Sequence, residues 1–218
     1  MAPFLTCRSV SRFFGERAVL REVSFAAEAG RLLALWGANG AGKSTLLRIL
    51  AGALRPSAGE AAIQGASAGS AAARRQTGFL SHQSLLHPHL TVQENLSFYA
   101  TLFELAAPAA AVRAALEQVR GEPLAGLRAG ELSQGMRQKA ALARCLLHQP
   151  RLLLLDEPFA SLDRATVAEL RRCLVELRAA GMTILATSHQ EEALRDLADG
   201  ELWLERGRLA AAAEVGPE

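Results

Sequence analysis

The sequence predicts an α/β fold with a parallel sheet core, an antiparallel β subdomain and an inserted α-helical subdomain. One observation is a glycine-rich loop, 37–44, between a buried strand at 31–36 and a helix at 45–51 that ends at Gly52. Another is that short apolar segments of strand length alternate with helical segments, as in parallel sheets. These apolar segments are 77–81, 152–155 and 182–187. The four leucines of 152–155 predict a central strand covered on both faces.

The loop 37–44 matches the phosphate-binding pattern, Gly, any four residues, Gly-Lys, then Ser or Thr. Its glycines let backbone N–H groups turn inward around phosphate oxygens, and the helix N-terminus adds unpaired donors. Lys43 supplies charge to the β- and γ-phosphates, and Ser44 offers a hydroxyl to Mg²⁺. A glycine-rich turn without a ligand is the alternative, but the complete pattern and both flanks favour a nucleotide site. Its expected nucleotide-binding residues are Gly37, Asn39, Gly40, Gly42, Lys43, Ser44 and Thr45.

Composition sets limits on the class of protein. The chain has 218 residues, half of them hydrophobic, and a formal net charge of +2, with no basic block that would indicate nucleic-acid binding. Cys7, Cys145 and Cys173 are scattered, which predicts buried reduced thiols in a cytoplasmic protein. The N-terminus lacks the apolar core of a signal peptide, and no apolar run reaches the ~18–20 residues that span a bilayer. Any work at a membrane is therefore expected to go through a partner.

An antiparallel pair of strands is expected before the loop. Phe4–Val10 and Val19–Glu28 have strand character, with a turn at Gly15-Glu16 between them. Phe13 and Phe14 lie at this turn and point to opposite sides of an extended segment. One of them can serve the core while the other stacks on a flat ligand, and two core phenylalanines are the alternative.

A helical region interrupts the α/β pattern. The sequence predicts one domain over 1–218, in which 1–87 and 149–218 form the α/β core and 88–148 forms the helical subdomain. The expected helices begin at the capping box of Thr91 and Glu94, at Ala109 and after Ser133. Phe98, Tyr99 and Phe103 are expected in the core of the first of these helices. Short segments complete the pattern: a strand at 60–64, a loop with one helical turn at 65–73, helices at 166–180 and 191–197, and a hairpin of 201–205 with 208–212.

Polar residues follow the predicted strands and predict hydrolytic chemistry. Asp156 and Glu157 lie at the carboxyl end of an apolar strand, the edge at which parallel sheets bind ligands. There Asp156 can hold Mg²⁺ and Glu157 can deprotonate a water, and Pro158 predicts an extended backbone at Glu157. His189 and Gln83 follow two other strands, although each alone is more typical of a surface residue. The predicted catalytic residues are Glu157, His189 and Gln83, and the predicted metal ligands are Ser44, Gln83 and Asp156.

Three histidines, His82, His87 and His89, are close in sequence. A metal site is conceivable, but no carboxylate or cysteine pattern accompanies them, so an exposed loop is the preferred interpretation.

The order of these motifs resembles that of the ATP-binding subunit of ABC transporters along almost the whole chain. Leu132–Met136 is similar to that family's signature, Ser161–Asp163 to its D-loop, Gln83 to its Q-loop residue and His189 to its switch histidine. Phe14 falls where the family places an aromatic ring on adenine. The resemblance implies a P-loop NTPase (RecA-like) fold that hydrolyses ATP with Mg²⁺.

The resemblance also implies partners. Two cassettes would form a head-to-tail homodimer around ATP, with Ser133, Gly135 and Asp163 of one subunit near the nucleotide of the other. A transmembrane subunit would hold the protein at the cytoplasmic face of the cell membrane. Gln134 and Met136 depart from the usual signature, which predicts altered rates and not loss of the site.

Two local segments favour a finer assignment. Ser81–Ser84 and Glu94–Tyr99 are similar to the ATPase of the cytochrome c maturation system, the haem exporter. An exporter ATPase for drugs, antibiotics or lipids is the alternative. Less favoured are a soluble ABC-type ATPase that acts on ribosomes or DNA, because one cassette is present without a heptad run, and a regulatory module without turnover.

Overall fold

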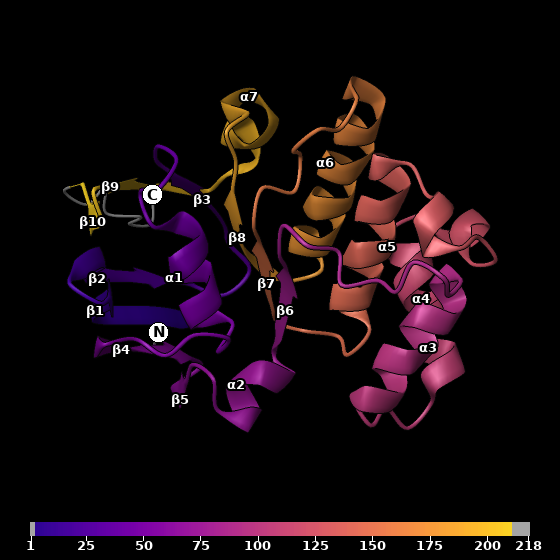
Figure 1. The fold of residues 1–218 in the computed structure, drawn as a ribbon, viewed down its shortest axis with the longest axis horizontal. Helices are drawn as coiled ribbons and strands as arrows, with labels where there is room; N and C mark the ends of the chain where they lie inside the picture. Colours follow the sequence, from indigo (N-terminus) through magenta and orange to yellow (C-terminus); the bar gives the residue numbers. More distant parts are fainter. Residues whose placement is uncertain (1–2, 211–218) are drawn as a thin grey trace.

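Two sheets organise the chain in the computed structural model, which describes residues 3–210 (Figure 1). The larger sheet has six strands in the order β10-β9-β3-β8-β7-β6. All its pairs are parallel except the β9–β10 hairpin, so the predicted parallel core is confirmed. Its strands are β3 (Leu32–Trp36), β6 (Thr77–Leu80), β7 (Leu152–Leu155), β8 (Thr183–Thr187), β9 (Gly200–Glu205) and β10 (Arg208–Leu209).

The smaller sheet is antiparallel and has the order β2-β1-β4-β5. The turn at Gly15-Glu16 is confirmed, but both long strands run closer to it than the sequence predicts. The hairpin at the end of the large sheet turns at Arg206-Gly207 as predicted, while residues 211–212 of its second strand lie outside the described part. The strands of the small sheet are β1 (Leu5–Phe14), β2 (Arg17–Ala27), β4 (Ala58–Ile63) and β5 (Ala66–Ser67).

The helices lie on both sides of the large sheet, with α1 on one side and α5 and α6 on the other (Figure 1). The segment 65–73 contains the short strand β5 and the start of α2, and the predicted helix 191–197 is a short α-helix followed by a 3₁₀ turn at Arg195–Leu197. The helices are α1 (Lys43–Leu50), α2 (Ala71–Arg75), α3 (Val92–Leu102), α4 (Pro108–Gln118), α5 (Gln134–Leu146), α6 (Arg164–Ala179) and α7 (Glu191–Leu194).

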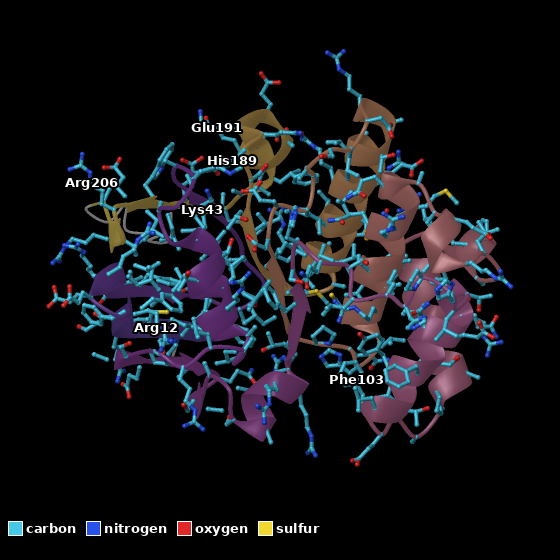
Figure 2. The ribbon with its side chains drawn as sticks, viewed as in Figure 1. Arg12, Lys43, Phe103, His189, Glu191 and Arg206 are labelled. Carbon is cyan, nitrogen blue, oxygen red and sulfur yellow. The ribbon has the colours of Figure 1, made fainter. Side chains whose placement is uncertain are left out.

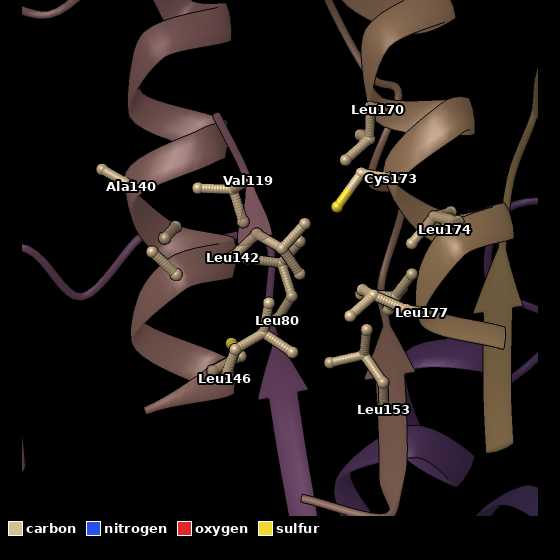
Figure 3. Packing of buried hydrophobic residues seen from close by; sticks show 14 of the residues in the cluster. Leu80, Val119, Ala140, Leu142, Leu146, Leu153, Leu170, Cys173, Leu174 and Leu177 are labelled. Atoms are coloured by element: carbon tan, nitrogen blue, oxygen red, sulfur yellow. The ribbon is translucent and has the colours of Figure 1, made fainter. Parts of the chain in front are cut away.

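Strand β7 is buried on both faces, as predicted. Leu153 and Leu155 belong to the apolar cluster beneath α5 and α6, whereas Leu152 and Leu154 belong to the cluster toward α1 and the small sheet. Figure 3 shows Leu80 and Leu153 of neighbouring strands packed between leucines of α5 and α6. Full burial of one such leucine stabilises the fold by about 1.5–3 kcal/mol, so this sheet is a rigid base for the residues at its edge.

The aromatic residues of α3 do not fill the core as the sequence suggests. Phe98 is 60% exposed and Phe103 37% exposed, while Tyr99 is half-buried. The buried residues of α3 are Val92, Asn95, Leu96 and Ala100, at the three- and four-residue spacing of one side of a helix. Phe98 therefore lies on the opposite side, and the expectation of a core phenylalanine was wrong there.

The cysteines confirm the expectation of buried, unpaired thiols. Cys7, Cys145 and Cys173 are all free and buried. Burial raises the pKa of Cys7 to about 12 and that of Cys173 to about 11, and it raises the pKa of Cys145 as well. Within residues 3–210 no helix is both long and apolar enough to cross a bilayer.

We expect native protein to react slowly with a thiol reagent such as DTNB at pH 8. A raised pKa leaves little thiolate at that pH, and burial blocks access to the sulfur atoms. The absorbance of released thionitrobenzoate measures the reaction, and unfolding in guanidinium should make all the thiols react at once. Rapid release of a full equivalent from folded protein would contradict the burial of these side chains.

Candidate nucleotide-binding site

The site lies at the carboxyl edge of the large sheet, where three neighbouring strands end together. Strand β8 pairs in parallel with β3 on one side and β7 on the other. The register places Leu35 beside Thr187 and Leu155 beside Ala186. The segments that follow these strands, namely the glycine-rich loop, the two carboxylates and the histidine, therefore meet at one edge.

The glycine-rich loop needs glycine at the start of α1. Gly42 is the N-cap residue of this helix and has φ +112°, a conformation that side chains with a Cβ rarely adopt. A Cβ at this position would meet Leu20 Cδ2 at 2.8 Å and Val19 O at 2.9 Å. No side chain caps α1, so its first N–H groups stay available for an anion.

Lys43 braces the loop in this structure. Its side chain is buried, and Nζ donates to Gly37 O at 2.6 Å and to Ala38 O at 3.3 Å. Burial lowers the pKa of Lys43, while the carboxylates of Glu157 and Asp156 act in the opposite direction and favour the charged form. The ammonium group thus lies inside the loop. It donates to two loop carbonyl oxygens, and the sequence predicts that phosphate oxygens accept these hydrogen bonds when a nucleotide is bound.

Two hydroxyl groups, one from the first turn of α1 and one from the end of β8, converge on Asp156. Ser44 Oγ donates to Asp156 Oδ1 at 2.9 Å, and Thr187 Oγ1 donates to the same oxygen at 3.2 Å. A carboxylate and a hydroxyl are hard oxygen ligands of the kind that Mg²⁺ prefers. The donor set of Ser44 and Asp156 therefore fits Mg²⁺ that accompanies a nucleotide.

Glu157 and His189 form a close pair above this edge. The His189 N–H donates to Glu157 Oε2 at 2.9 Å, and His189 Nε2 lies 3.3 Å from Glu157 Oε1. Oε1 is buried but accepts no aligned hydrogen bond, so it keeps a lone pair for another donor. The Glu157 backbone is left-handed, with φ +54°, and the predicted extended conformation was wrong. Its N–H donates to Thr187 Oγ1 and its carbonyl accepts from Ala160, which together hold a tight turn.

Phe13 and Phe14 are both at the surface. Their side chains are 46% and 49% exposed, so neither the pair of core residues nor the single core residue that the sequence suggests is correct. Phe14 ends β1, and the Arg12 guanidinium lies 4.6 Å from its ring centroid. The stacking of adenine on Phe14 stays a prediction.

The residues expected from a second subunit lie apart from the phosphate loop. Ser133 and Asp163 are the N-cap residues of α5 and α6, on the opposite side of the sheet from α1 (Figure 1). Gly135 packs against Thr166, and a Cβ on it would lie 2.7 Å from Thr166 Cγ2. Hydrogen bonds from Thr166 lower the pKa of Asp163 and keep its carboxylate on the cap.

The loop after β6 is exposed. Gln83 is at the surface, and its carbonyl accepts a hydrogen bond from Ser81, so its proposed role at the metal stays a prediction. His82, His87 and His89 are exposed as expected. Across residues 3–210, no three His, Cys, Asp or Glu side chains gather as a metal site would require.

Sequence reasoning missed two residues that touch this site. Thr187 contacts both Asp156 and Glu157, and Gln138 of α5 donates to Pro158 O at 2.8 Å. A signal for Thr187 was present, because a polar residue ends a largely apolar strand two positions before His189. The sequence held no comparable signal for Gln138, because its hydrogen-bond partner is a backbone carbonyl, which every residue has.

Comparison with known proteins agrees with this geometry. The sequence model of one family, described as ABC transporter, matches residues 20–160. The chain is 42% identical over 208 residues to an Fe(3+) ions import ATP-binding protein of Rhodococcus jostii, covering 92% of this chain and 59% of the relative. It is 41% identical to a sulfate/thiosulfate import ATP-binding protein of Burkholderia mallei, covering 94% and 61%. It is 38% identical to a Nod factor export ATP-binding protein of Burkholderia lata, covering 94% and 68%.

The fold also matches a solved structure. A dimeric post-hydrolysis ATP-binding cassette with ADP and Pi superposes with a TM-score of 0.88 at 24% identity, covering 98% of this chain and 100% of that chain. The fold is that of an ATP-binding cassette, with a glycine-rich loop between a central strand and a helix. The chain belongs to the ABC transporter family. The relatives described above are named as ATP-binding proteins. It spans about three fifths of the length of the two import relatives.

We expect Lys43→Ala to lower the affinity for ATP by at least about tenfold, because it removes a buried charge inside the loop that is predicted to bind the phosphates. Fluorescence of a methylanthraniloyl ATP analogue measures the binding. Lys139→Ala is the matched control, since Lys139 is the other lysine of the chain and pairs with Glu169. Equal affinities of the two variants would contradict the role assigned to Lys43.

Proposed function

We propose that this chain is the ATP-binding subunit of an ABC transporter and that it hydrolyses ATP to drive a membrane partner. In this proposal the nucleotide binds on the loop 37–45, with Phe14 against adenine, and Ser44, Asp156 and Gln83 hold Mg²⁺. The observation that carries it is the assembly of Lys43 and Asp156 with the Glu157–His189 pair at one sheet edge. Bound Mg²⁺ would neutralise charge on the phosphates.

The residues of the chain would then act as follows. Lys43 exchanges the loop carbonyls for phosphate oxygens, because its ammonium group already lies inside the loop. Glu157 Oε1 accepts a proton from the attacking water, since this buried oxygen keeps a lone pair free beside its 3.3 Å contact with His189 Nε2. His189 holds the other carboxylate oxygen through its backbone N–H and so fixes the direction of that lone pair.

A second copy of the chain would complete the site. Ser133 and Asp163 are the N-cap residues of α5 and α6 and Gly135 lies in the first turn of α5, and these helices lie on the opposite side of the sheet from α1, which follows the phosphate loop. A head-to-tail homodimer, which the family resemblance implies, would carry them to the nucleotide of the opposite subunit. The Ser133 side chain and the first N–H groups of α5 would then donate to the γ-phosphate.

The membrane partner would bind at an apolar patch of the helical region, which we define as Leu85, Phe98 and Leu102. These side chains are 51%, 60% and 63% exposed. The patch is continuous with the Gln83 loop, because Tyr99 of α3 donates its hydroxyl to Leu85 O at 2.7 Å. Motion of a partner on this patch would therefore reach the loop that carries Gln83. This arrangement would place the protein at the cytoplasmic face of the cell membrane.

The cargo is a separate proposal. The Ser81–Ser84 and Glu94–Tyr99 segments favour haem export in cytochrome c maturation. The names of the relatives described above concern import of Fe(3+) ions, import of sulfate or thiosulfate, and export of Nod factor. They support the transport class, and they do not favour haem over the alternative of a drug, antibiotic or lipid exporter. Purification of the membrane subunit with the tagged chain, followed by identification of its cargo, would decide between them.

We expect Glu157→Gln to bind ATP normally, to lose most turnover and to accumulate as a dimer with ATP. The change removes the base but leaves the phosphate loop and Asp156 intact. Phosphate release and size-exclusion chromatography with ATP and Mg²⁺ measure the two effects. Glu60→Gln, on the surface of the small sheet, is the control and should behave as the unaltered chain does. A Glu157→Gln chain that stays monomeric with ATP would count against the closed dimer.

We expect the double change Phe98→Ser and Leu102→Ser to release the protein from membranes while ATP turnover of the isolated chain is retained. The change removes apolar surface of the patch without touching the sheet edge. Sedimentation of the tagged chain with membranes of its own cells measures the effect. Val175→Ser is the control, because Val175 is an exposed apolar residue on α6. Equal membrane association of all three chains would exclude the patch as the docking surface.

A further inference from the structure

Thr187 lies at the centre of the hydrolytic edge although none of the sequence motifs contains it. It is the last residue of β8, and its side chain is fully buried. We propose that the Thr187 hydroxyl is the positioning group that orients both Asp156 and Glu157 for hydrolysis. This inference rests on the function proposed above and names a further residue of the same site.

The hydroxyl serves both carboxylate residues at once. It donates its one hydrogen to Asp156 Oδ1 at 3.2 Å, and it accepts the Glu157 N–H at 2.9 Å. A threonine hydroxyl has one hydrogen and two lone pairs, so the two bonds are compatible. A single group therefore fixes the orientation of the metal-side carboxylate and the backbone of the catalytic carboxylate.

The hydrogen bond from Thr187 to Asp156 comes from a central strand of the sheet. Ser44 also donates to Asp156 Oδ1, but Ser44 is only half-buried, at the phosphate loop. Thr187 instead belongs to a strand that is paired on both sides, and Leu35 lies beside it in the register. Asp156 is thus held by the sheet even when the hydroxyl oxygen of Ser44 serves a metal ion.

The contact with Glu157 supports an unfavourable backbone. A non-glycine residue in the left-handed region, as Glu157 is with φ +54°, persists only when surrounding contacts hold it there. The Thr187 hydroxyl binds the N–H of this residue, and the His189 N–H binds its carboxylate. Both ends of Glu157 are therefore tied to the end of β8, and this sets the direction of Oε1.

A purely structural role is the competing explanation, and the same strand contains its comparison. Thr183 begins β8, is equally buried, and accepts the Gly30 N–H at 3.0 Å, at the opposite edge of the sheet. Each threonine thus satisfies one backbone N–H, and each loses that bond when valine replaces it. Only Thr187 also touches Asp156, so only Thr187 is expected to affect metal dependence and turnover.

Valine and serine variants test the proposal. We expect Thr187→Val to lower kcat by about ten- to hundredfold, because two hydrogen bonds around charged groups are lost. The Mg²⁺ concentration that gives half of the thermal stabilisation by a non-hydrolysable ATP analogue should rise several-fold, while affinity for the analogue without Mg²⁺ stays within about twofold. Thr187→Ser should restore most of kcat and of the Mg²⁺ response. Thr183→Val should match the unaltered chain in both, apart from a lower melting temperature.

Three results would overturn the proposal. The first is that Thr187→Val has unaltered turnover and an unaltered Mg²⁺ response. The second is that Thr187→Val loses no more kcat than Thr183→Val does. The third is that Thr187→Ser folds but is as impaired in turnover as Thr187→Val. If Thr187→Val does not fold, Thr187→Cys replaces it, since a thiol of similar size is a weaker hydrogen-bonding group and should give an intermediate loss. An unaltered chain that neither binds nor hydrolyses ATP would instead overturn the proposed function itself.

Discussion

The carboxylate of Asp156 connects the end of β7 to the start of α1 and to the end of β8 through hydrogen bonds. Asp156 follows β7 and accepts hydroxyl hydrogens from Ser44, after β3, and from Thr187, at the end of β8. Because these strands are neighbours in a parallel sheet, the bonds cross between elements that are far apart in sequence. The glycine-rich loop, Asp156 and the Glu157–His189 pair therefore share one support, and a shift of any strand end would disturb all three.

The positive charge of Lys43 at this edge is balanced by nearby carboxylates and carbonyl oxygens. Lys43 is buried, and two carboxylates favour its charged form, while carbonyl oxygens of its own loop accept its hydrogens. Figure 2 shows Lys43 and His189 on the same side of the molecule, at the sheet edge, whereas Phe103 lies at the helical region. Burial of an ammonium group without such partners would be costly, so the loop geometry and the carboxylates depend on one another.

Sequence patterns predicted the parts of this site that come from local chemistry. The strand, loop and helix around Lys43 follow from glycine spacing and apolar runs, and the strand-end position of Asp156 follows from the leucines before it. The left-handed Glu157 could not be predicted, because a hydroxyl from another strand stabilises it. The exposure of Phe98 could not be predicted from aromatic content either, because smaller residues already fill the buried face of α3. In each case a tertiary contact decided what the local pattern left open.

The helical region contacts the turn that holds Glu157 through a hydrogen bond as well as through the apolar core. Gln138 of α5 donates to Pro158 O, the carbonyl next to Glu157, and Gly135 allows the start of α5 to touch Thr166 of α6. A rotation of α5 would therefore pull on the turn that sets the direction of Glu157. Since Ser133 is the N-cap residue of this helix, the element that the proposal brings to a second nucleotide also contacts the Glu157 turn of its own chain. In the proposed head-to-tail homodimer, closure of one site and a movement of the Glu157 turn at the other would then be coupled, because one helix takes part in both.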